Sequence, residues 1–283
     1  MFKKKKSLWL FLLPGLAGLL VFYVVPFIGG LYFSMTDGTI ANQFVWFKNY
    51  QRVWENDVFR LGLQNSLELS LISAPLIFLF SFVLSVMLRS LKERSLGFRN
   101  ILLMPYLVPS SALLIIWMIL FDYGGVINRL VAAMGLERVL WLESAALRVP
   151  VVLLYVWKNI GFSVVIFSAA LSSVPDEFYE FARLEGANVL QQEVKITLPL
   201  ILPTAFLVFV LAWVNAFKIF KEVYFIGGAY PRDAVYTLQH FMNNKFAKLD
   251  YQDVTTAAYS FALIVFVLFG MLYAGKGVRG SDR

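Results

Sequence analysis

Long runs of apolar residues constrain this chain more than any other feature of its sequence. A helix needs about 20 mostly apolar residues to cross the hydrocarbon core of a bilayer, and six runs qualify. They lie approximately at residues 8–33, 67–88, 101–121, 149–171, 198–220 and 255–274. Each run is apolar on all sides, as expected of a helix surrounded by lipid and other helices. The sequence therefore predicts an all-α polytopic membrane protein, with six transmembrane helices in a single domain over residues 1–283.

The composition agrees with a membrane protein and excludes several chemistries. Hydrophobic residues make up 59% of the chain and charged residues 15%, whereas an average soluble domain is about 45–50% apolar and about 25% charged. The chain has no Cys and one His, so it cannot form a disulfide, a Cys-ligated metal site or a multi-His metal site. It also has no phosphate-binding Walker loop and no set of nucleophile and base. We expect no metal site, no cofactor bound by this chain and no enzymatic activity.

The positive charges predict an orientation rather than a nucleic-acid partner, because they lie between the apolar runs and not in one stripe. With the N-terminus inside, the inner segments are 1–7, 89–100, 172–197 and 275–283. These 54 residues hold 13 Lys and Arg, whereas the 101 residues of the outer segments hold 11. Cytoplasmic loops carry the excess of Lys and Arg. We therefore expect both termini in the cytoplasm.

The inner segment 172–197 is the most informative polar part of the chain. Ser173 and the Pro and acids after it are typical of a helix start, and Gly186 is typical of a helix end or a sharp bend. A second amphipathic segment, 187–196, then leads into the fifth apolar run. The sequence predicts a short helix, a glycine hinge and a second helix at the cytoplasmic surface.

The first of these short helices has one amphipathic face, formed by Phe178, Phe181, Ala182 and Glu185. One interpretation is a helix that lies on the lipid surface, but such helices usually carry Lys and Arg on their polar face. This segment is acidic, and anionic lipid headgroups repel acidic segments. A docking site for a protein partner is the better interpretation.

The segment from Glu180 to Pro199 resembles the EAA loop of bacterial ABC importer permeases. The matching residues are Glu180, Ala182, Gly186, Ala187, Ile196, Leu198 and Pro199. Further stretches resemble the maltose/oligosaccharide branch of these permeases, in order along nearly the whole chain: Met104-Pro105, Trp117, Trp157–Gly161, Phe217–Phe220 and Thr237–Gln239. The resemblance implies the MetI-like fold of type I ABC importer permeases.

The same resemblance implies a set of partners and a location. A second permease subunit, usually a paralogue, would pair with this chain in the bacterial cell membrane. Two ATPase subunits would bind ATP and Mg and hydrolyse the ATP. An extracellular binding protein would deliver a carbohydrate, which we expect to be an oligosaccharide.

Carried over by resemblance, the EAA helix docks into the ATPase and transmits its closure to the membrane spans. The residues expected to take part are Phe178, Glu180, Phe181, Ala182, Arg183, Glu185, Gly186 and Ala187. Glu180 would pair with the ATPase, and Gly186 would supply the bend between the two short helices. Phe178 and Phe181 are either apolar anchors on the ATPase or side chains packed against the permease's own spans.

The fourth apolar run carries the expected solute path. Polar residues inside a span are functional candidates, and aromatic faces combined with amides suit sugar rings. By resemblance to the maltose-type permeases, the expected path residues are Trp157, Lys158, Asn159, Gly161, Ser163 and Val164, and Asn215, in the last part of the fifth run, is a further candidate. Two structural alternatives remain open, namely an ion pair between Lys158 and a neighbouring span and ordinary packing of Trp157.

Two alternative functions follow from the same sequence. The same machinery could carry another polar solute, such as a glycerol phosphodiester or a polyol. A secondary transporter driven by an ion gradient is the alternative from a different class. Such transporters usually show internal repeats and buried acids for ion coupling. We find no clear repeat, and Glu68 is the only acid within a predicted span.

Overall fold

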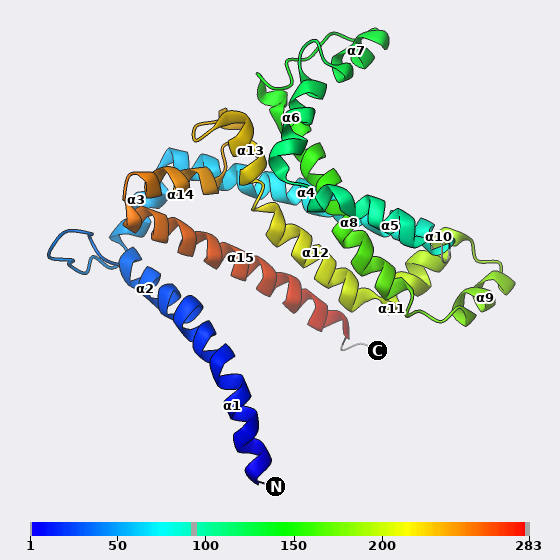
Figure 1. Cartoon of the computed structure of the whole chain (residues 1–283), viewed down its shortest axis with the longest axis horizontal. Coiled ribbons are helices and arrows are strands. Elements are labelled where there is room, and N and C mark those ends of the chain that lie inside the picture. The colour runs from blue at the N-terminus through cyan, green and yellow to red at the C-terminus, as the bar shows by residue number, and fades with distance from the viewer. Residues whose placement is uncertain (1, 92–94, 281–283) are drawn as a thin grey trace. The chain divides into compact units, whose positions relative to one another are not determined.

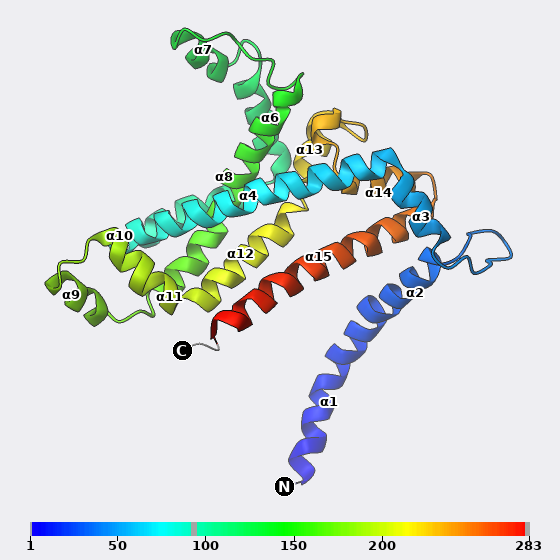
Figure 2. The same ribbon diagram turned by 180° about the vertical axis from the view of Figure 1, so that it is seen from behind.

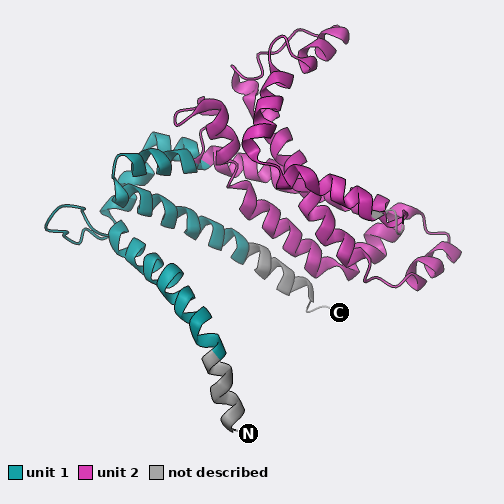
Figure 3. Cartoon of the chain, in the orientation of Figure 1, with its two compact units in different colours: residues 1–63, 238–283 teal, residues 64–237 magenta. Residues whose placement is uncertain are grey.

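The computed structural model describes residues 2–91 and 95–280, and its regular elements are helices. Within these residues the only extended pairing is an isolated bridge between Thr36 and Phe44. The chain forms two compact units, which are Met1–Leu63 with Leu238–Arg283 (unit 1) and Gln64–Thr237 (unit 2) (Figure 3). Lys92, Arg94 and Arg283, which contribute to the predicted charge bias, lie outside the described residues.

Six helical stretches of the described chain are long and apolar enough to cross a membrane. They are Phe11–Ser34, Asp57–Arg89, Ser110–Ala133, Ala145–Leu171, Leu202–Gly227 and Tyr251–Gly270. The predicted fold class is thus confirmed. The apolar run 101–121, however, is divided between α5 (Ser95–Leu107) and α6 (Ser110–Phe121). Pro109, with extended backbone (ψ 131°), separates them, because proline lacks an N–H and disfavours a helical residue before it.

Unit 1 contains the first and the last apolar helices of the chain. Its elements are α1 (Phe2–Leu19), the π-helical turn η1 (Leu20–Val24), α2 (Val25–Ser34), α3 (Lys48–Glu55), α14 (Leu238–Ala247) and α15 (Tyr251–Gly280); α4 (Asp57–Arg89) also begins here. The first three follow one another along a single helical path (Figure 1). The last helix, α15, packs against α2, α3 and α14.

A buried carboxylate joins three helices of unit 1. Asp253 of α15 accepts hydrogen bonds from Arg52 of α3, at 2.5 Å, and from Lys245 of α14, at 2.6 Å. In addition, the Trp54 indole donates to the Ser260 hydroxyl at 3.1 Å. A buried charge is tolerated when it is paired in this way, so these contacts hold the polar end of α15 in place.

The buried imidazole of His240, in α14, leads to an expected pH dependence. Burial disfavours the charged form and lowers the pKa of His240 from 6.5 to about 4. Between these values the unfolded chain binds a proton that the folded chain does not, so stability should fall as the pH drops from about 6.5 towards 4. We expect the thermal unfolding midpoint to fall between roughly pH 7 and pH 5, and to fall less in a His240→Gln variant. An equal fall in both proteins would contradict this role of His240.

Unit 2 is built around α8 (Arg148–Leu171), which packs against α5 (Figure 1) and α12 (Figure 2). Its other elements are the rest of α4, then α6, α7 (Val126–Ala133), η3 (Ala145–Leu147), α9 (Glu177–Leu184), α10 (Val189–Gln192), η4 (Glu193–Thr197), α11 (Leu198–Leu200), α12 (Leu202–Ala216), α13 (Phe220–Gly227) and η5 (Asp233–Val235). In the apolar stretch Ala145–Leu171, which contains α8, half of the most apolar segment is buried within the protein. This helix is therefore the centre of the unit.

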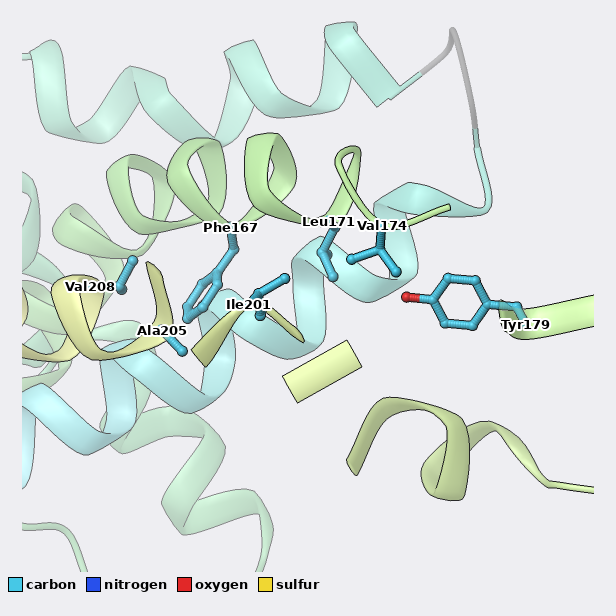
Figure 4. Close-up of a cluster of buried hydrophobic side chains, with 7 residues drawn as sticks. All are labelled: Phe167, Leu171, Val174, Tyr179, Ile201, Ala205 and Val208. Atoms are coloured by element: carbon cyan, nitrogen blue, oxygen red, sulfur yellow. The ribbon is translucent and has the colours of Figure 1, made fainter. Parts of the chain in front are cut away.

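One buried hydrophobic cluster connects α8 and α12 with the loop between them. It comprises Phe167, Leu171, Val174, Tyr179, Ile201, Ala205 and Val208 (Figure 4). Phe167 also contacts Phe78 and Phe82 of α4 edge-on, with ring centroids 5.4 and 5.5 Å apart. Because Val174 and Tyr179 belong to the polar segment 172–197, this cluster fastens that segment to the apolar helices.

Candidate functional site

The segment 172–197 folds as the predicted helix, hinge and second helix. Helix α9 ends at Leu184, and Gly186 follows with a φ of +79°. The Ala187 amide donates to the Ala182 carbonyl at 2.9 Å, which is the bond typical of a helix that ends in a left-handed glycine. No other atom lies within 4 Å of a Cβ built on Gly186, so the backbone conformation alone requires glycine here.

The second short helix begins with a capping box. The Asn188 side chain accepts from the Gln191 amide, and the Gln191 side chain accepts from the Asn188 amide, each at 2.9 Å. The expected cap of the first helix differs, because the Ser173 hydroxyl donates back to the Ala170 carbonyl at 2.7 Å. Ser173 thus closes the end of α8, and α9 starts at Glu177 without a side-chain cap.

Helix α9 is anchored by one aromatic residue and leaves its other large side chains exposed. Tyr179 is buried, and its hydroxyl makes a hydrogen bond of 2.8 Å to the Thr197 hydroxyl. In contrast, Phe178 is 48% exposed and Phe181 is 68% exposed. Both rings therefore keep about half or more of their surface accessible in this chain. The sequence analysis did not single out Tyr179. Its place four residues before Arg183, on an amphipathic helix, could have marked it as a residue of interest.

The surface of α9 is acidic as well as apolar. Glu177, Glu180 and Glu185 are exposed, and Leu184 beside them is 84% exposed. Ala182 and Ala187 are half-buried, and Arg183 donates to the Tyr179 carbonyl at 3.2 Å. Four of the expected coupling residues, together with Leu184, thus form an exposed surface with carboxylates next to aromatic and aliphatic side chains, which we call the α9 surface (Phe178, Glu180, Phe181, Leu184 and Glu185).

A pocket in unit 2 brings together three of the seven expected path residues. These are Lys158 and Asn159 of α8 and Asn215 of α12. Its other lining residues come from the corner between α5 and α6, from α8, and from the stretch α12–α13: Tyr106, Val108, Pro109, Ser110, Tyr155, Lys218, Lys221 and Glu222. The pocket therefore offers amides, hydroxyls, aromatic faces and charges to a polar solute.

A buried ion pair lies at one side of this pocket. The Lys158 ammonium is 3.0 Å from a Glu222 carboxylate oxygen and also donates to the Ser110 hydroxyl. The two charged side chains are 14% and 3% exposed. Lys158 therefore both pairs with a neighbouring span and lines the pocket.

Glu222 corrects the sequence argument, which found Glu68 to be the only acid within a span. The fifth apolar helical stretch extends to Gly227 and contains Glu222, whereas the predicted run ended at residue 220. Glu68 forms an ion pair with Arg148 at 2.8 Å. The signal for the buried pair was an ammonium in the fourth run and a carboxylate two residues after the end of the fifth run.

The other expected path residues lie elsewhere on α8. Trp157 stacks on Trp117, with ring centroids 5.8 Å apart. Val164 is buried, and its carbonyl accepts from the Ser85 hydroxyl at 3.2 Å. Ser163 lines a narrower cavity together with Asn159 and Asn215. The structure thus divides the path residues between a pocket-facing set and a packing set.

Gly161 belongs to the packing set, because α5 passes directly over it. A Cβ built on Gly161 would lie 1.9 Å from the Leu102 carbonyl oxygen. Overpacking of this kind costs about 1–3 kcal/mol or more, so we expect Gly161→Ala to lower the thermal unfolding midpoint of the purified protein clearly. Gly97→Ala, on α5 itself, is the matched control, because no atom lies within 4 Å of that Cβ. Equal midpoints in the two variants would contradict the close contact.

The described residues include no group of three or more His, Cys, Asp or Glu that could hold a metal ion. The arrangement instead combines a polar pocket among apolar helices with an exposed acidic surface on a short helix. The first can receive a polar solute, and the second can receive a protein partner. Both features lie in unit 2.

Known proteins resemble this chain over almost its whole length. The lactose transport system permease protein LacF of Rhizobium radiobacter is 26% identical, over 95% of this chain and 93% of its own. The trehalose/maltose transport system permease protein MalF of Thermococcus litoralis is also 26% identical, over 98% and 95%. A solved chain of a bacterial ABC transporter involved in the import of the acidic polysaccharide alginate superposes with a TM-score of 0.81 at 22% identity, covering 99% of this chain and 98% of that one.

The solved structure shows that the expected fold of an ABC importer permease is correct. A sequence model covers residues 77–275, and it describes the inner membrane component of binding-protein-dependent transport systems. This match spans more than half of the chain and includes both the pocket and the α9 surface. The ion-driven secondary transporter is not favoured by it. The chain belongs to the family of inner membrane components of binding-protein-dependent transport systems.

Proposed function

We propose that this chain is the permease subunit of an ATP-driven importer that takes up an oligosaccharide delivered by an extracellular binding protein. Relatives named for lactose and for trehalose and maltose support a carbohydrate. The pocket supports it as well, because Asn159, Asn215 and Ser110 can hydrogen-bond sugar hydroxyls while Tyr106 offers an apolar ring face. In this role the chain moves solute and leaves the chemistry of ATP to its partners.

The exposed α9 surface is the observation that carries this proposal. A short helix with Phe181 and Leu184 more than two-thirds exposed is unfavourable in water, and its acidic residues disfavour anionic lipid. Aromatic residues in well-packed pockets dominate protein interfaces. We infer that α9 docks into a cleft of an ATPase subunit, with Phe178 and Phe181 as anchors and Glu180 as the charged contact. Ala182, Arg183, Glu185, Gly186 and Ala187 shape the same contact.

The proposed assembly also implies an orientation of the chain in the membrane. The ATPase subunits bind ATP and Mg in the cytoplasm, so the loop 172–197 lies on that side, and both termini lie there too. A second permease, which we expect to be a paralogue, completes the solute path opposite the pocket. The path residues of this chain are Lys158, Asn159, Ser163 and Asn215, while Trp157, Gly161 and Val164 hold α8 in position behind them.

Gentle purification of the chain from its own membranes, followed by mass spectrometry, tests the proposed assembly. We expect a second six-span permease and an ATPase to be recovered with it. In proteoliposomes this complex should hydrolyse ATP faster when its binding protein and one of lactose, trehalose or maltose are added. Recovery of the chain alone, with uptake that depends on an ion gradient instead of ATP, would overturn the proposal.

A further inference from the structure

Arg89, the last residue of α4, contacts two separate parts of the loop 172–197. Its guanidinium is 2.5 Å from a carboxylate oxygen of Glu193, which belongs to η4. The same guanidinium lies over the Tyr179 ring of α9, 4.2 Å from the ring centroid. The Arg89 and Glu193 side chains are 28% and 7% exposed, so water screens their attraction only partly.

Tyr179 connects these contacts into one cluster. Its ring receives the Arg89 cation, and its hydroxyl is bonded to the Thr197 hydroxyl at the end of η4. Thr197 is completely buried. Four side chains from α4, α9 and η4 therefore form a single network, which we call the Arg89 cluster (Arg89, Tyr179, Glu193 and Thr197).

Two buried polar atoms of the Arg89 cluster lack a hydrogen-bond partner. Among the described residues, no group hydrogen-bonds to the buried Nη1 of Arg89 or to the second, buried carboxylate oxygen of Glu193. An arginine and a carboxylate that meet in parallel would make two bonds instead of one. Moreover, η4 is a π-helical turn, a local irregularity that is frequent at functional sites. The pair can thus gain a second bond if α4 and η4 shift relative to each other.

We propose that Arg89 is a positioning residue that ties α4 to the coupling loop, so that movement of α9 is transmitted to α4. The inference rests on the proposed function, because it requires α9 to dock on an ATPase. Helix α9 already reaches α12 along the chain through α10, η4 and α11, and it reaches α8 through the hydrophobic cluster. Helix α4 meets the same hydrophobic cluster through Phe78 and Phe82, and the Arg89 cluster adds a polar link between the end of α4 and the loop.

The ratio of solute transported to ATP hydrolysed tests this link in the complete importer, with radiolabelled lactose, trehalose and maltose as probes. Coupling between sites is typically worth a factor of about 5 or more, so we expect Arg89→Gln to lower the ratio at least about fivefold. Glu193→Gln should act in the same way, and the double variant should be no worse than the worse single variant. Arg129→Gln, on exposed α7, is the matched control and should keep the wild-type ratio.

A second measurement does not depend on solute. The chain has no Cys, so spin labels at Ser90→Cys and at Glu177→Cys, an exposed residue of α9 outside the α9 surface, report the distance between the end of α4 and α9 in a complex whose partner subunits lack Cys. We expect Arg89→Gln to broaden that distance distribution. An unchanged distribution and an unchanged ratio would overturn the role of Arg89. A wild-type complex that shows no ATPase response to binding protein and sugar would overturn the proposed function itself.

Discussion

Replacing Glu180 with Lys is expected to abolish solute uptake while the permease still folds and inserts. The Glu180 side chain is exposed and makes no hydrogen bond or ion pair with the described residues, so the change costs the isolated chain only the favourable place of a carboxylate in the first turn of α9. A charge that meets a like charge in an interface costs several kcal/mol. We therefore expect a loss of at least about 100-fold in uptake, measured in cells that lack the native permease.

The loop between α7 and η3 supplies the matched control for this charge reversal. Glu137 is also exposed, and Glu137→Lys should leave uptake close to the wild-type rate. Membrane fractions should contain both variants in equal amounts. Co-purification should recover the ATPase with Glu137→Lys and not with Glu180→Lys. If Glu180→Lys transported normally and still bound the ATPase, the assignment of α9 as the docking helix would be wrong.

The helices of the loop 172–197 could be predicted closely from the sequence because their signals are local. Gly186 adopts the left-handed backbone that its place after an amphipathic helix indicated, and Asn188 with Gln191 supplies the cap of the next helix. The start of the loop was less predictable, since Ser173 can bond either forwards as a cap or backwards to α8. In the structure it bonds backwards to Ala170, and α9 starts at Glu177 without a side-chain cap.

The solute pocket depends on a tertiary arrangement that one sequence shows only in part. The path residues on α8 divide by helical period, because Asn159 and Ser163 lie four residues apart on the pocket side while Trp157 and Gly161 lie four apart on the side of Trp117 and Leu102. The sequence placed all of them in one span but could not tell which face meets α12. Likewise, the break at Pro109 was visible as a proline, but its consequence required the packing of α5 on α8.

Variants of Lys158 and Glu222 should separate two roles of this ion pair, which are the stability of the protein and the transport of solute. Removing one partner of a buried ion pair typically costs about 3–5 kcal/mol, whereas replacing both with apolar residues is often neutral or stabilising. We therefore expect Lys158→Met and Glu222→Leu each to lower the thermal unfolding midpoint of the purified protein, and the double variant to regain most of it.

The double variant should nevertheless remain at least about tenfold slower in uptake, because a site built to hydrogen-bond a polar solute loses affinity when its polar groups are removed. Lys218→Met is the control, because Lys218 lines the same pocket but is exposed, and its ammonium bonds only Asn215. The thermal unfolding midpoint of this variant should match that of the wild type. A wild-type midpoint for Lys158→Met would contradict the buried pair. Wild-type uptake by the double variant would restrict Lys158 and Glu222 to a structural role, because the polar groups that meet the solute would then be the amides and hydroxyls that remain.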